Sequence, residues 1–103
     1  MSYFLYRLIA PRPTFNNDMS PDEAAIMGQH VAYWQHLADR GTAVVFGPVA
    51  DPAGPWGLAI VQADSEEEVQ TLRLDDPARQ LDGARFEVYA MPGAIGAHPR
   101  ITA

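Results

Sequence analysis

The 103-residue chain contains neither cysteine nor lysine, and all seven of its basic residues are arginine. The lack of cysteine excludes a disulfide framework, a thiol nucleophile and a thiolate metal site. The lack of lysine excludes a Schiff base and a P-loop. Thirteen acidic residues give a formal net charge of −6, which disfavours binding to nucleic acid phosphates or anionic membranes. We therefore predict neither nucleic acid nor a membrane as a partner.

The sequence also lacks long apolar runs and a targeting segment. No run approaches the roughly 18 apolar residues of a membrane-spanning helix. The apolar start is interrupted by Arg7 and has no basic region before it, so it predicts a strand and not a signal peptide. Together with the missing cysteines, this favours a cytoplasmic protein. The length and the 48% apolar content predict one globular domain at residues 1–92, followed by an irregular tail at residues 93–103.

The clearest local signal is a helix over residues 21–40. Ser20, Pro21 and Glu23 form the pattern of an N-cap, a proline in the first turn and a capping box. Apolar side chains then recur at helical spacing as far as Gly41, a residue typical of the position just after a helix.

A second, shorter helix begins with a capping pattern at Ser65 and ends at Asp75-Asp76-Pro77. Gly47-Pro48 should end the second strand, because proline cannot continue a ladder, and the composition of residues 11–19 indicates a loop. Short apolar and aromatic segments predict four strands, at residues 2–10, 42–46, 56–63 and 84–91. This β-α-β-β-α-β order is that of an α+β, ferredoxin-like fold, a four-stranded antiparallel sheet with two helices on one face.

RNA-recognition domains share this strand order, and their third strand carries a basic residue and aromatic side chains that stack on bases. Residues 56–63 keep the glycine, the small residue and the valine of that motif. They lack its basic residue and its three stacking aromatics. Together with the negative charge, this excludes an RNA-recognition domain.

Both faces of the predicted sheet are apolar. In the first strand, one face carries Tyr3, Leu5 and Ile9 and the other carries Phe4, Tyr6 and Leu8. The open face of such a sheet is polar in a monomer, and large exposed apolar surfaces are rare. We therefore predict a homodimer in which two sheets pack face to face. The alternative is a monomer with a ligand cleft on that face.

His30 is the most informative polar residue, because it lies on the apolar stripe of the helix over residues 21–40, one turn before Trp34. An imidazole titrates near neutral pH and acts as a general acid or base when a partner fixes its tautomer. Asp76 is the candidate partner, since a carboxylate orients an imidazole and stabilises its charged form. The sequence leaves open whether Asp75 takes that place, whether both acids only end a helix, and whether His30 is a hydrogen-bonded core residue.

Candidates for contact with a small-molecule ligand are four aromatic residues and a Gly-Pro pair: Tyr6, Trp34, Phe46, Gly47, Pro48 and Trp56. The alternatives are a packed core for the aromatic residues and an ordinary turn for the pair. No metal is expected, because His30 and His36 face different sides of their helix and His98 lies in the tail. No nucleotide-binding motif is present either, and we predict no cofactor.

The sequence resembles the YCII-related (YciI-like) family over nearly all of the chain past residue 20. The resemblance rests on His30-x-x-Tyr33-Trp34-x-x-Leu37-x-x-x-Gly41, Phe46-Gly47-Pro48-Val49, Asp51-Pro52-x-Gly54-x-Trp56-Gly57, Ser65-x-Glu67-Glu68, Asp76-Pro77 and Phe86-Glu87-Val88-x-x-Met91-Pro92. It implies a dimeric α+β barrel, in which the sheets of a homodimer face each other. It also implies an active site built on a histidine and an aspartate, which by motif are His30 and Asp76.

The hypothesis that unites these observations is a proton-transfer enzyme, a lyase or isomerase that acts on a small organic molecule. Related barrels handle small, often aromatic compounds by isomerisation, elimination or mono-oxygenation. A His–Asp pair without a thiol or cofactor fits the abstraction and return of a proton. The competing hypothesis is a non-catalytic ligand-binding or accessory dimer in which His30 is structural.

Overall fold

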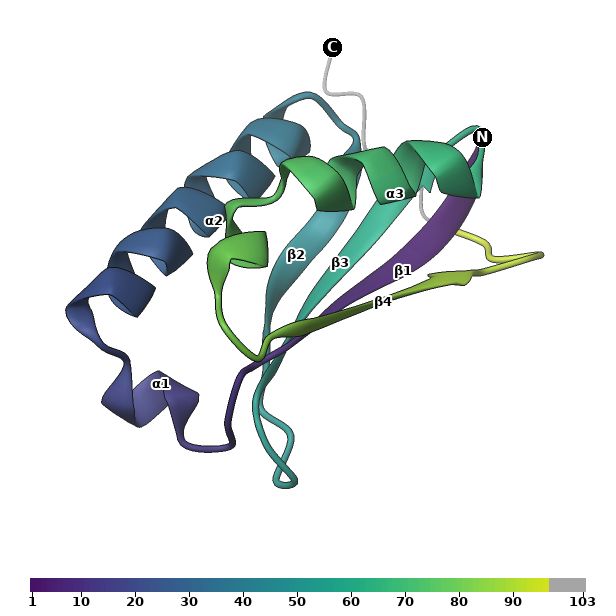
Figure 1. The fold of residues 1–103 in the computed structure, drawn as a ribbon. Coiled ribbons are helices and arrows are strands. Elements are labelled where there is room, and N and C mark those ends of the chain that lie inside the picture. Colours follow the sequence, from purple (N-terminus) through teal and green to yellow (C-terminus); the bar gives the residue numbers. More distant parts are fainter. Residues whose placement is uncertain (97–103) are drawn as a thin grey trace, which may run out of the picture.

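A computed structural model describes residues 1–96 of the chain (Figure 1). His98 and most of the predicted irregular tail lie outside the described residues. The elements in chain order are β1 (Ser2–Ile9), α1 (Phe15–Asp18), α2 (Pro21–Asp39), β2 (Ala43–Val49), β3 (Trp56–Ala63), α3 (Glu66–Asp75), the 3₁₀ helix η1 (Pro77–Gln80) and β4 (Arg85–Ala90). Within residues 1–96, no helix is long and apolar enough to cross a membrane.

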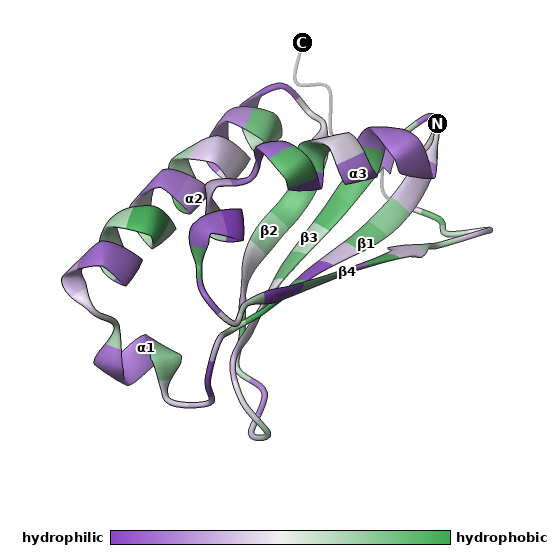
Figure 2. Cartoon of the chain, viewed as in Figure 1, coloured by the Kyte–Doolittle hydropathy of each residue, from purple (hydrophilic) through white to green (hydrophobic). Residues whose placement is uncertain are grey.

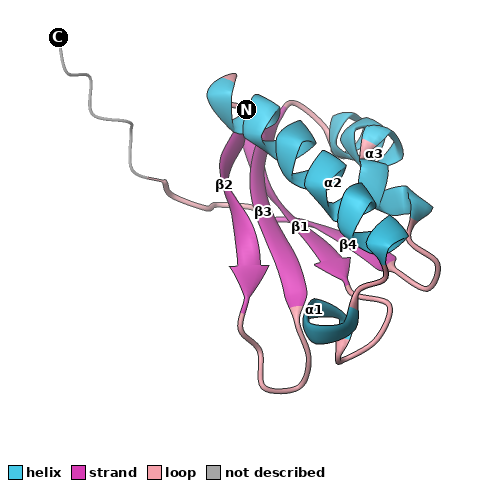
Figure 3. Cartoon of the chain, turned by 90° about the vertical axis from the view of Figure 1, so that its left-hand side faces the viewer, coloured by secondary structure: helices cyan, strands magenta, loops and turns pink. Residues whose placement is uncertain are grey.

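The four strands form one antiparallel sheet in the order β2-β3-β1-β4. This order, with α2 and α3 as the two helical connections, confirms the predicted α+β, ferredoxin-like arrangement. Both α2 and α3 lie on the same face of the sheet (Figure 1, Figure 3). Side chains that point inward from the sheet therefore meet residues of both helices.

The capping box predicted at Ser20 is present and fixes the start of α2. The Ser20 hydroxyl accepts a hydrogen bond from the backbone N–H of Glu23 at 3.1 Å, and the Glu23 carboxylate accepts one from the Ser20 N–H at 2.9 Å. At the start of α3, the Ser65 hydroxyl accepts from the Glu68 N–H at 3.3 Å. There the box stays open, because the Glu68 carboxylate accepts from the N–H of Asp64 instead.

Two local predictions are wrong. The second strand does not end at Gly47-Pro48, because β2 continues to Val49. Pro48 pairs with Gly57 at the edge of the sheet, where a strand needs hydrogen bonds on one side only. Residues 11–19 are not wholly a loop, because they contain α1, which places the side chain of Phe15 in the core at 2% exposure.

The core fills the space between the sheet and the helices. Figure 2 shows hydrophobic residues along the strands that the helices cover. The main cluster of buried side chains consists of Phe4, Tyr6, Trp34, Leu37, Ala43, Ala59, Val61, Ala63 and Val69. On the opposite face, apolar residues of the central strands are only half-buried, among them Tyr3, Leu5, Ile9, Leu58 and Ile60.

Candidate active site

Asp76 lies where α3 gives way to η1. Its backbone is extended, with φ −68° and ψ 122°, because the following Pro77 disfavours a helical conformation. The Asp76 side chain then caps η1 by accepting a hydrogen bond from the N–H of Ala78 at 2.9 Å. This turn directs the Asp76 carboxylate inward, where it is fully buried, whereas Asp75 is exposed.

The buried carboxylate of Asp76 accepts four hydrogen bonds. Its Oδ1 accepts from Nδ1 of His30 at 2.7 Å and from the Ala78 N–H. Its Oδ2 accepts from the Tyr6 hydroxyl and from the indole Nε1 of Trp34, each at 2.9 Å. These donors come from β1, α2 and η1, so one carboxylate links three parts of the fold. A buried carboxylate requires such partners, because it has left the water that would otherwise solvate it.

These hydrogen bonds also set the ionisation of the site. Burial favours the neutral acid, but hydrogen bonds from His30, Trp34 and Ala78 outweigh burial and hold the pKa of Asp76 below its ordinary value. Burial, reinforced by the nearby carboxylate, raises the pKa of Tyr6 well above its ordinary range. At neutral pH, Asp76 is therefore an anion and Tyr6 remains a hydrogen-bond donor.

His30 joins this network on one side and faces open space on the other. It lies one turn before Trp34, so both side chains project from the same face of α2. A carboxylate can only accept hydrogen bonds, so Nδ1 of His30 carries the proton that it shares with Asp76. The other ring nitrogen, Nε2, has no partner within residues 1–96. A neutral imidazole in this tautomer presents a free lone pair on Nε2.

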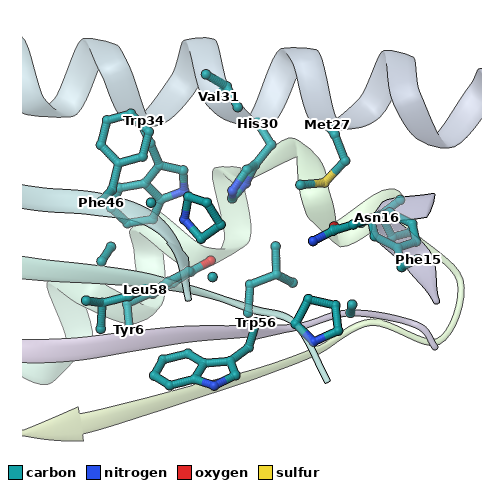
Figure 4. Close-up of a pocket in the computed structure, with 18 residues that line it drawn as sticks. Tyr6, Phe15, Asn16, Met27, His30, Val31, Trp34, Phe46, Trp56 and Leu58 are labelled. Carbon is teal, nitrogen blue, oxygen red and sulfur yellow. The ribbon is translucent and has the colours of Figure 1, made fainter. Parts of the chain in front are cut away.

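The open space is a cavity of about 210 Å³ between the sheet and the middle of α2. Figure 4 shows the His30 ring pointing into it, between Met27 and Trp34. Its lining comes from β1, α1, α2, β2, β3 and the loops near them, and no Arg, Asp or Glu belongs to it. The lining residues are Tyr6, Leu8, Ala10, Phe15, Asn16, Met27, His30, Val31, Trp34, Phe46, Gly47, Pro48, Pro55, Trp56, Gly57, Leu58, Ala59 and Leu81.

A known protein family covers most of the chain. A model of the YCII-related domain matches residues 1–92. The chain belongs to the YCII-related family. Among solved structures, this YCII-related protein is similar to protein SP2199 from Streptococcus pneumoniae, with 18% identity and a TM-score of 0.44 over 92% of this chain and 90% of that chain. No curated protein matches the chain.

All six residues that the sequence nominated for ligand contact line the cavity of this YCII-related protein. Their side chains differ in direction. In Figure 4, the indole of Trp56 points away from His30. It lies 4.5 Å from the guanidinium of Arg7, and its Nε1 donates to Asp51 at 3.0 Å. Trp56 therefore borders the cavity without turning its ring towards the imidazole.

Sequence reasoning missed two features of the site in this YCII-related protein. Tyr6 and Trp34 were expected to touch a ligand, yet their polar atoms hold Asp76. Asn16 was placed in a loop, although it lines the cavity. The Asp-Pro pair does carry one usable signal, because an acid just before a proline is a typical N-cap, and this distinguishes Asp76 from Asp75.

Within residues 1–96, no three His, Asp or Glu side chains gather as metal ligands would. The imidazole of His30 has a single charged neighbour, Asp76, at hydrogen-bond distance. The described side chains of this site can therefore bind an apolar molecule and move a proton through His30 Nε2.

Proposed function

We propose that this YCII-related protein is a cofactor-independent proton-transfer enzyme, a lyase or isomerase that acts on a small organic molecule. One observation carries the proposal. The fully buried carboxylate of Asp76 holds Nδ1 of His30 at 2.7 Å, while the ring of His30 lines a largely apolar cavity. A histidine with only a structural role would have no need of a free nitrogen at a cavity wall.

The proposed step uses Nε2 of His30 as the base. Nε2 takes a proton from a carbon of the substrate, so that a C–H bond breaks, an N–H bond forms and the electron pair stays on the substrate. The imidazolium is stabilised by the carboxylate of Asp76, which stays ionised. Return of the proton to another carbon completes an isomerisation. Its return to a departing group, as the electron pair forms a double bond, completes an elimination.

Asp76, Tyr6 and Trp34 are positioning residues in this proposal. Asp76 selects the tautomer of His30, and Tyr6 and Trp34 hold the second oxygen of the carboxylate. The side chains of Tyr6 and Trp34 are also packed against each other, with ring centroids 4.8 Å apart. The orientation of the base therefore rests on the packed core and not on a mobile loop.

Hydrogen–deuterium exchange tests the proposal without knowledge of the natural reaction. A panel of small carbonyl compounds is incubated with the protein in D₂O, and loss of α-proton signals is followed by NMR. We expect at least one compound to exchange faster with the wild-type protein than with His30→Gln. His36→Gln is the matched control, because His36 lies on the same helix but outside the cavity. Its exchange should equal that of the wild type.

The non-catalytic hypothesis makes the opposite prediction. It is favoured if compounds bind in the cavity, as judged by shifted resonances of His30 and Trp34, while none exchanges faster than with His30→Gln. In that case His30 only shapes a binding site, and the enzymatic proposal is wrong.

We also propose that the chain acts as a homodimer through the sheet face that carries no helix within residues 1–96. The half-buried apolar residues Leu5, Leu58 and Ile60 of the central strands support this assembly. Two charged groups near the centre of this face are matched, since Arg7 and Glu87 form an ion pair at 3.0 Å, while Arg85 lies exposed at the end of β4. A second copy of the same face would cover the apolar residues, with Arg7 and Glu87 already paired within each chain.

A further inference from the structure

The cavity contains a second polar side chain that the proposed reaction does not use. Of the side chains that line it, Tyr6 and Trp34 donate their hydrogen bonds to Asp76. The indole of Trp56 donates its hydrogen bond to Asp51. Asn16 is exposed at the edge of the cavity, and its carboxamide has no hydrogen-bond partner within residues 1–96, so a ligand can replace the water that solvates it. Figure 4 shows it extending from α1 towards the space beneath His30. His30 and Asn16 thus bring the unused side-chain hydrogen-bonding groups to this cavity.

The position of Asn16 is fixed by its neighbours on both sides. Phe15 is buried at 2% exposure and anchors α1 in the core. The guanidinium of Arg12 donates to Asp18 at 2.8 Å and to Glu23 at 2.8 Å, which ties α1 to the first turn of α2. The Thr14 hydroxyl also donates to Asp18, at 2.6 Å. Because α1 is clamped at both ends, Asn16 is held at the cavity rather than left on a free loop.

The charge of the lining restricts the ligand. No arginine or acidic residue lines the cavity, and the carboxylate of Asp76 lies behind the His30 ring rather than in the lining. A charged substrate group would lose its water without gaining an ion pair, which is costly. A carboxamide offers a neutral ligand both a donor and an acceptor. The cavity therefore favours an uncharged polar group at the Asn16 end.

The volume of the cavity limits the size of the ligand. An apolar cavity of about 150 Å³ holds benzene, so about 210 Å³ accommodates an aromatic ring with a short substituent. Apart from His30 and Asn16, the lining is mostly apolar, with Leu8, Met27 and Phe46 among its members. This matches a ligand with an apolar body and a single neutral polar group.

We infer that Asn16 is a substrate-orienting residue that binds the carbonyl or hydroxyl oxygen of a small, uncharged, largely apolar substrate. This rests on the proposed function, because the substrate so held presents its acidic C–H to Nε2 of His30. The Asn16 N–H donates to the carbonyl oxygen, which is where the electron pair accumulates when the α-carbon loses its proton. Asn16 therefore determines which substrates are placed for proton transfer.

A binding experiment tests this inference independently of catalysis. Three probes of equal size are used: acetophenone with a neutral carbonyl, cumene with no polar atom and benzoate with a charge. Affinity is measured on the full chain by NMR titration of the wild type, Asn16→Ala and Asn17→Ala. Asn17 is the matched control, because it lies on the same short helix and does not line the cavity.

We expect acetophenone to bind the wild type more tightly than benzoate. Asn16→Ala should lower the affinity for acetophenone roughly three- to tenfold, because one neutral hydrogen bond is lost. The affinity for cumene should not change. Asn17→Ala should change neither. The inference is overturned if acetophenone does not bind, if benzoate binds more tightly, if cumene weakens as much as acetophenone, or if Asn17→Ala has the same effect as Asn16→Ala. If this pattern holds while no compound exchanges deuterium, the enzymatic proposal fails and Asn16 is a ligand-binding residue without a role in proton transfer.

Discussion

Four donors around one carboxylate make Asp76 the residue on which the site depends most. His30, Ala78, Tyr6 and Trp34 all donate to it within 2.9 Å. Removal of one donor leaves three, whereas removal of the carboxylate leaves four donors without their shared acceptor. The same carboxylate that orients His30 therefore also stabilises the contact between the sheet and the helices.

The first prediction concerns the pH dependence of stability. The folded pKa of Asp76 is lowered, so the unfolded chain takes up a proton on this group first as the pH falls. The contribution of ionised Asp76 to the free energy of unfolding is therefore complete above an ordinary carboxyl pKa of about 4 and is lost at lower pH. Asp76→Asn should cost about 3 kcal/mol at pH 7 and progressively less below pH 4. Urea unfolding at a series of pH values measures this difference.

Asp75→Asn provides the control. Asp75 is exposed and, within the described part of the chain, its carboxylate makes no hydrogen bond. Its replacement should change stability by less than about 0.5 kcal/mol at every pH. Other acid-sensitive groups, such as Glu23 beside Arg12, are present in all variants and cancel from the comparison. An equal pH dependence in Asp76→Asn and the wild type would contradict the role given to Asp76.

The accuracy with which the sequence predicts this site depends on the range of the interactions. Helical spacing alone predicts that His30 and Trp34 lie on the same face of their helix. The hydrogen bonds from Tyr6 and Trp34 to Asp76 were not predictable, because they join positions 70 and 42 residues apart. Asn16 had no signal, since a one-turn helix has too few residues for a periodic pattern.

At the scale of the element, α2 carries His30, and its start is fixed by a closed capping box. The Glu23 carboxylate accepts from the Ser20 N–H and also from Arg12, which in turn donates to Asp18 at the end of α1. The corresponding box at Ser65 is open, because Glu68 bonds to Asp64. The two helices therefore begin with similar sequences, but α2 has both hydrogen bonds of a capping box and α3 has one of them.

This difference gives a second stability prediction. Ser20→Ala should lower the free energy of unfolding by about 1 kcal/mol, because it removes a side-chain acceptor and loosens Glu23. Ser65→Ala should cost roughly half as much, since it removes one longer hydrogen bond. The midpoints of urea unfolding compare the two. A larger loss for Ser65→Ala would show that the closed box adds nothing.

Elements were predictable where local chemistry is strong and not where packing decides. The predicted third strand has the observed bounds, and the first long helix begins at the predicted Pro21. Pro48 was predicted to end the second strand, although the predicted ferredoxin-like order already places that strand at the sheet edge, where a proline is permitted. The sequence could not reveal α1, because the burial of Phe15 depends on distant residues such as Leu81.

At the scale of the whole molecule, the sheet has two apolar faces and one set of helices. The inner face is covered by α2 and α3 (Figure 3). The outer face carries Leu5 at its centre, paired across the sheet with Ile60 on one side and Tyr89 on the other. The cavity opens beside α2 and is lined mostly from the inner face, although Trp56 and Leu58 of β3 also border it. Other apolar residues of the outer face, such as Leu5 and Ile60, are therefore available to contact a second copy of the chain in the proposed dimer.

A charge on this face should prevent dimerisation without disturbing the site. Size-exclusion chromatography with light scattering should give the wild type about twice the 11.3 kDa of one chain, and Leu5→Asp a single-chain mass. Leu5→Asp should remain folded by circular dichroism, because Leu5 is only half-buried in the single chain. Leu74→Asp is the control, since Leu74 is 49% exposed on α3, on the helix side of the sheet, and its charge would face solvent in either state. A wild-type mass of 11.3 kDa, or a Leu5→Asp variant that keeps the mass of a dimer, would show that the outer sheet face is not the interface.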